Sequence, residues 1–133
     1  MFKNISVLVA LSLIGTAAYA SSQSEGQIAE GSVFLLQLHV GQGNMTLKQR
    51  ADVVQERLPD ILGMPGLSPS DVHDVKQGNQ YNIMVGSHLL VTCTAADAKV
   101  NNVSVQKQAM MWMDSLKKGL MEVKSGGAVP VSK

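Results

Sequence analysis

Residues 81–92 read Tyr-Asn-Ile-Met-Val-Gly-Ser-His-Leu-Leu-Val-Thr, two runs of strand-forming residues on either side of Gly86-Ser87. A two-residue connection that begins with glycine is typical of a type II′ turn between antiparallel strands. The sequence therefore predicts a tight hairpin here. A weaker strand, with few apolar residues, is expected over residues 70–76, before a turn at Gly78-Asn79.

Amphipathic helices are predicted on both sides of these strands. Upstream, Thr46 and Gln49 form a capping-box pattern. The apolar residues that follow recur at helical spacing: Leu47, Ala51, Val54, Leu58, Ile61 and Leu62. Because proline lacks an amide hydrogen and collides with the preceding turn, Pro59 either ends this helix near Leu58 or bends it.

Downstream, Thr94 and Asp97 form a second capping-box pattern, which predicts a short helical turn. Ser104 is the expected N-cap of the last helix. Its apolar stripe consists of Val105, Ala109, Trp112, Met113, Leu116, Leu120 and Val123.

The first strand is expected over residues 33–40, where Phe34, Leu36 and Leu38 share one face by period two. The resulting order, β-α-β-β-β-α, predicts an α+β fold. We expect a mainly antiparallel four-stranded sheet with both long helices packed on one face.

Both ends of the chain differ from this core. Residues 1–20 contain Lys3, an apolar run and the small-x-small sequence Ala18-Tyr19-Ala20, which predict a signal peptide cleaved after Ala20. We expect a flexible lead-in at 21–31, a single domain at 32–124 and a flexible tail at 125–133. The protein is thus expected to be periplasmic or secreted, and not an integral membrane protein after cleavage.

Composition excludes several classes of function. The formal net charge is +1, so nucleic acid is not an expected partner. The one cysteine, Cys93, cannot form a disulfide within a monomer; it is either a buried free thiol or a bridge between two chains. Nucleophile-elbow and dinucleotide-binding motifs are absent, so we expect no catalytic residues, no cofactor and no enzymatic activity.

Two groups of residues are candidates for metal binding or catalysis. Met110, Met111, Cys93 and His88 offer thioether, thiol and imidazole ligands that suit Cu(I), although methionines on a helix also fill cores. Asp71, His73 and Asp74 form the only local group of acids and imidazole, which a solvated edge strand also explains. His39, His73 and His88 are too scattered to predict a zinc site.

Lys48, Arg50, Glu56 and Arg57 are expected on the exposed face of the first long helix, where they could meet a protein partner or an anionic headgroup. Mixed charges on such a face more simply indicate solvation. Association is expected instead through an open sheet edge, either residues 33–39 or residues 70–76, which could pair with a second copy.

Three segments together resemble an extracytoplasmic domain of certain bacterial mechanosensitive channels. They are the hairpin at 81–92 followed by Thr94-Ala95-Ala96-Asp97-Ala98, the spacing of Ala109, Trp112 and Leu116, and the helix at 50–58. Gly86-Ser87 stands where that pattern has Asn-Gly, and no channel segment follows. The resemblance implies a small sensory or interaction module and carries over no catalytic residue.

The sequence therefore predicts an exported, non-enzymatic binding module, either sensory or self-associating. The alternative is a periplasmic soft-metal protein that uses methionine, histidine and cysteine.

Overall fold

The computed structural model describes residues 24–126. The expected signal peptide and residues 127–133 of the expected tail lie outside this range. The elements in chain order are β1 (Gln27–Glu30), β2 (Val33–Gln37), α2 (Leu47–Leu62), the 3-10 turn η1 (Pro69–Asp71), β3 (Val72–Gln77), β4 (Gln80–Val85), β5 (His88–Cys93), α3 (Ala95–Val100) and α4 (Val105–Lys124). The α+β prediction is confirmed.

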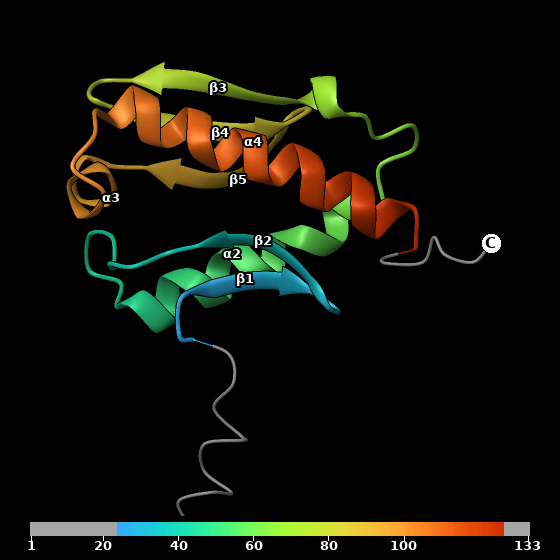
Figure 1. The fold of residues 1–133 in the computed structure, drawn as a ribbon, viewed down its shortest axis with the longest axis horizontal. Helices are drawn as coiled ribbons and strands as arrows, with labels where there is room; N and C mark the ends of the chain where they lie inside the picture. The colour runs from blue at the N-terminus through green and yellow to red at the C-terminus, as the bar shows by residue number, and fades with distance from the viewer. Residues whose placement is uncertain (1–23, 127–133) are drawn as a thin grey trace, which may run out of the picture.

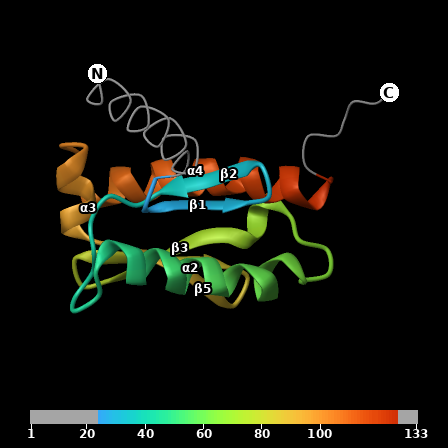
Figure 2. The ribbon, with the colours of Figure 1, turned by 90° about the horizontal axis from the view of Figure 1, so that it is seen from below.

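The elements form two layers, and each layer holds one sheet and one long helix (Figures 1 and 2). In one layer, α4 lies alongside the β1–β2 hairpin. In the other, α2 lies alongside β5 of the three-stranded sheet β3–β4–β5. The apolar core fills the space between the layers; its largest fully buried apolar side chains are Ile28, Leu35, Leu36, Leu38, Leu58, Ile61, Ile83, Leu90, Leu116 and Leu120.

This arrangement corrects the expected single sheet. Among the described residues, β2 pairs only with β1, so the strands form an antiparallel pair and an antiparallel triplet rather than one four-stranded sheet. The two long helices also do not share one face of a sheet. Helix α4 covers the triplet from the opposite layer, whereas α2 continues the layer of the triplet beyond β5 (Figure 2).

Strand β1 occupies residues that were expected to form a flexible lead-in. The expectation is wrong for this segment because its largest apolar residue, Ile28, is fully buried opposite Leu36. Gly31 joins β1 to β2 with φ +60°, a conformation that glycine adopts without steric cost. The polar composition of this segment therefore does not exclude a strand, because Ile28 is buried and Gly31 makes the turn into β2.

A β-bulge changes the phase of β2. Ala29 pairs with Phe34 and Ile28 with Leu36, so Leu35 is the extra residue. The predicted common face of Phe34, Leu36 and Leu38 is therefore wrong: Leu36 and Leu38 are buried, and Phe34 is 49% exposed.

The predicted helix starts are confirmed. Thr46 and Thr94 each form a capping box, and the Ser104 hydroxyl accepts a hydrogen bond from Lys107 N. Helix α2 continues through Pro59 to Leu62, so it does not end near Leu58. Within residues 24–126, no helix combines the length and apolarity needed to cross a membrane.

Candidate functional site

Arg50 and Asp97 form a buried ion pair between α2 and α3. Arg50 Nη1 lies 2.7 Å from Asp97 Oδ1, and Arg50 Nη2 lies 2.8 Å from Oδ2. Both side chains are 1% exposed. The prediction that Arg50 lies on the solvated face of its helix is therefore wrong.

The guanidinium also joins two backbone segments to this pair. Its Nη1 donates to the Val40 carbonyl at 2.9 Å, and its Nη2 donates to the Thr92 carbonyl at 2.7 Å. Its carbon lies 5.9 Å from the centre of the Trp112 ring, within cation–π range. One charged side chain thus connects the loop after β2, the end of β5, α3 and α4.

Asp97 has a second role as a helix cap. Its Oδ2 accepts from the Thr94 amide at 2.8 Å and from the Thr94 hydroxyl at 2.9 Å. The buried carboxylate therefore receives hydrogen bonds from Arg50 and from its own capping box, which offset the cost of removing it from water. The arrangement is structural: the acid is fully engaged and presents no free oxygen to a reactant.

Helical spacing is the signal that could have located Arg50. Residues 50, 54, 58 and 61 follow one another at intervals of four, four and three, so Arg50 extends the buried row of Val54, Leu58 and Ile61. A charged residue in a buried row indicates a buried partner of opposite charge. In the structure that partner is Asp97, which also belongs to the capping box of α3.

The proposed soft-metal ligands are not brought together. Met110 and Met111 are exposed on α4, whereas Cys93 is fully buried and donates to the Val105 carbonyl across 3.7 Å. Burial, and then the nearby Asp97 carboxylate, raise the pKa of the Cys93 thiol to about 12, so it stays protonated near neutral pH. His88 lies at the other end of β5 from Cys93.

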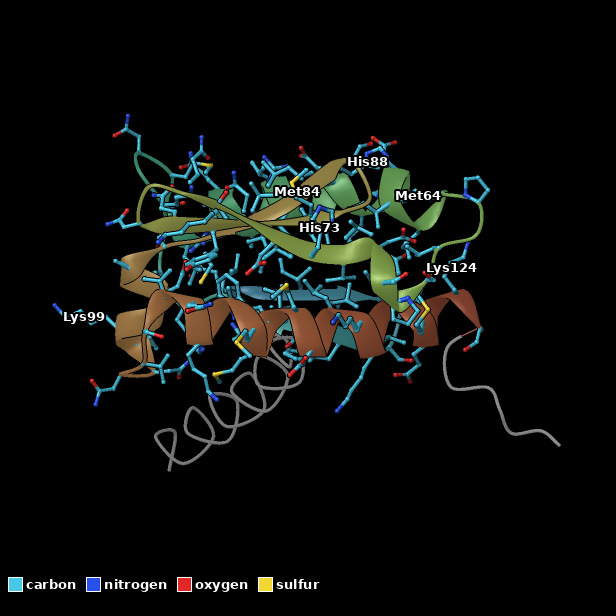
Figure 3. The ribbon with its side chains drawn as sticks, turned by 90° about the horizontal axis from the view of Figure 1, so that it is seen from above. Met64, His73, Met84, His88, Lys99 and Lys124 are labelled. Atoms are coloured by element: carbon cyan, nitrogen blue, oxygen red, sulfur yellow. The ribbon has the colours of Figure 1, made fainter. Side chains whose placement is uncertain are left out.

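Other soft ligands do lie near one another. His73 of β3 is directly opposite Met84 of β4, on the face of the triplet away from α4 (Figure 3). His73 Nδ1 forms a hydrogen bond with the Asp71 carbonyl oxygen at 3.0 Å. In the part of the chain that the structure describes, no three His, Cys, Asp or Glu side chains are grouped to hold a metal ion.

The acid and imidazole cluster does not line a common cleft. The Asp71 carboxylate accepts from the Ser68 amide at 2.8 Å and so caps η1. His73 and Asp74 are consecutive strand residues, and their side chains point to opposite faces of the sheet. His39 lies apart from them, in a hollow of about 200 Å³ between β2 and α4 that Phe34 and Met111 also line.

Helix side chains cover the backbone at the edge of β5. Arg57 Nη1 donates to the Leu90 carbonyl at 2.9 Å, two residues before the Thr92 carbonyl that accepts from Arg50. Because these acceptors are taken by α2, another strand cannot pair with β5 without displacing both guanidinium groups.

The β1–β2 hairpin is covered in a similar way. Gln55 of α2 donates to the Ala29 carbonyl at 2.6 Å, and its Oε1 accepts from the Ala29 amide at 3.4 Å. On the other side, Ser115 of α4 donates to the Leu35 carbonyl of β2. The edge expected at residues 33–39 is therefore closed.

Strand β3 presents the open edge. The turn at Gly78-Asn79 and the hydrogen bond from Gly86 N to the Asp71 carbonyl fix the register of β3 against β4. In this register the backbone groups of the odd-numbered residues of β3 form hydrogen bonds with β4. The amide and carbonyl groups of Asp74 and Lys76 then point outward, and neither pairs with a backbone or side-chain group of residues 24–126. Of the two edges that the sequence offered, β3 is the one left available.

The edge of β3 also carries an exposed apolar side chain. Val75 is 47% exposed, on the face opposite α4, and it lies between Asp74 and Lys76. Neither charged residue forms an ion pair with another described residue.

Comparison with known proteins identifies a family. The family model described as "Domain of unknown function (DUF8459)" matches residues 30–123, which is well over half of the chain. No curated protein and no solved structure matches the sequence. The chain therefore belongs to the family of domains of unknown function DUF8459.

Proposed function

We propose that this protein is an exported, non-enzymatic binding module that adds an extended segment of another polypeptide to the edge of β3. The observation that carries the proposal is the difference between the edge of β3 and the edges of the other strands. Helix side chains occupy backbone carbonyls of β1, β2 and β5, whereas the outward groups of Asp74 and Lys76 lack partners among the described residues. Strand addition uses such unpaired backbone groups for affinity and neighbouring side chains for specificity.

The candidate chemistry favours binding over catalysis. The Arg50 Nη atoms bond to the Asp97 carboxylate and to backbone carbonyls, and only the buried Arg50 Nε lacks a partner among the described side-chain atoms. The acid and imidazole residues near β3 point to different faces. The leader sequence supports export. The resemblance to an extracytoplasmic channel domain supports an interaction or sensory role. Export and this role are both part of the proposal.

The experiment uses a substitution that blocks strand addition without breaking the native sheet. Lys76→Pro removes an outward amide and leaves the bonds between β3 and β4 in place, because proline is tolerated at an edge strand when its nitrogen faces solvent. Lys76→Ala is the matched control, since it removes the same charge and keeps the amide. The tagged chain, its K76P variant and its K76A variant are crosslinked in the exporting cell, and bound proteins are identified by mass spectrometry.

We expect a partner that is captured by the native chain and by K76A but lost from K76P. Amide hydrogen exchange at Asp74 and Lys76 should slow when that partner is added to the purified protein. Equal capture by K76P would show that binding uses another surface, and the proposal would then be wrong.

A further inference from the structure

We infer that one occupant of the β3 edge is the β3 edge of a second copy of this chain, paired antiparallel about a twofold axis at Val75. The inference rests on the proposed function, since it requires that the edge accepts a strand. It adds the identity of the partner and the register of pairing. Two triplets would join into one continuous antiparallel sheet.

The hydrogen-bond pattern restricts the possible registers. Residues directly opposite each other in an antiparallel pair must both point toward the partner or both point away from it. Because Val72, Asp74 and Lys76 point outward and His73, Val75 and Gln77 point toward β4, a twofold axis must pass through a residue position and not between two positions.

Charge then selects among these registers. With the axis at Val75, Asp74 lies opposite Lys76 of the second copy, and Lys76 lies opposite Asp74 of that copy. With the axis at Asp74 or at Lys76, a charged residue faces its own copy, which is destabilising. An axis at His73 shortens the overlap and leaves both charges without an opposite. Only the Val75 register pairs both charges.

The apolar side chain supports the same register. Val75 would face Val75 of the second copy in a pair without hydrogen bonds between the two residues, the type in which the Cα atoms approach most closely, at about 4.5 Å. This contact would cover a valine that is 47% exposed in the single chain. Asp74 and Lys76 lie on the other face, so the charged pairs and the apolar contact do not compete for space.

The test reverses the charges singly and together. The chain, expressed with its own leader and purified after export, is compared with Asp74→Lys, Lys76→Asp and the double reversal by sedimentation equilibrium. Each single reversal places two like-charged pairs across the axis, and we expect it to raise the dimer dissociation constant about 10-fold or more. The double reversal restores opposite charges and should return the constant to within about threefold of the native value. Circular dichroism and urea midpoints check that the substitutions at half-buried Asp74 and exposed Lys76 leave the fold intact.

The outcomes separate this inference from the proposed function. A native chain that stays monomeric to about millimolar concentration, or a dimer that responds equally to all three charge variants, would overturn the inference. If another protein is still captured in a manner sensitive to K76P, strand addition itself stands. A dimer that persists in K76P would overturn the pairing of β3 edges altogether.

Discussion

Replacing Asp97 by asparagine should destabilise the domain more than its single-atom change suggests. The substitution keeps an oxygen that can accept from Thr94 and removes the charge that faces Arg50 across 2.7 and 2.8 Å. Arg50 would then remain 1% exposed with only the Val40 and Thr92 carbonyls as acceptors. Breaking a buried ion pair by removing one partner costs about 3–5 kcal/mol.

The measurement is urea unfolding followed by the fluorescence of Trp112, the one tryptophan of the chain. With a slope of about 1.5 kcal/mol per molar urea, the D97N midpoint should fall by about 2–3 M. Arg50→Met should cost a similar amount, because it leaves the Asp97 carboxylate buried without its charge partner. The double variant should cost little more than either single one, with a coupling free energy of at least about 2 kcal/mol.

An exposed ion pair on the same helix supplies the control. Lys48 and Asp52 lie 2.9 Å apart with most of both side chains in water, so Asp52→Asn should leave the midpoint unchanged within error. If the effects of R50M and D97N add to within about 0.5 kcal/mol, the two groups do not interact as described and the reasoning fails.

Three further predictions concern packing, titration and edge closure. Gly119→Ala should lower the free energy of unfolding by about 1–3 kcal/mol despite the better helix propensity of alanine, since the new methyl carbon would lie 2.9 Å from the Phe34 carbonyl oxygen; an unchanged urea midpoint would contradict this packing. Because the pKa of Cys93 rises from 9.0 to about 12 on folding, the native state holds its proton where the unfolded state loses it, and stability should fall between pH 9 and 12. That loss is about 1.4 kcal/mol at pH 10 and should be absent from Cys93→Ala when the two urea midpoints are compared across pH. Gln55→Ala should cost about 1 kcal/mol and speed hydrogen exchange of the Ala29 amide, whereas unaltered exchange would show that Gln55 does not close β1.

Local signals in the sequence were sufficient for the helices and the central hairpin. Thr46, Thr94 and Ser104 each fix a helix start through contacts within four residues of the chain, and Gly86 fixes the β4–β5 turn with φ +61°. Such features depend on nearest neighbours, so a sequence pattern records them directly.

The remaining features depend on contacts between distant residues. Strand β1 pairs its Ile28 with Leu36 of β2, and the carbonyl of the bulge residue Leu35 accepts from Ser115 of α4. Helical spacing places Arg50 in the buried row of α2, but its partner Asp97 lies 47 positions away and no local pattern joins the two. The β3 edge was one of the two edges predicted from the sequence. The sequence does not show that Ser115 and Gln55 form hydrogen bonds with the other strands, and these bonds distinguish the two edges.

The contacts of Arg50 also bear on how the protein can be cut and rejoined. A split reporter divided between β5 and α3 would leave the Arg50 guanidinium on one fragment and the Asp97 carboxylate on the other, although both groups are buried in the folded protein. Such fragments should be insoluble alone and should recover a native spectrum only when mixed. Insertions are better tolerated at Gly31-Ser32 or Gly78-Asn79, where the chain turns at the surface without contact with Arg50.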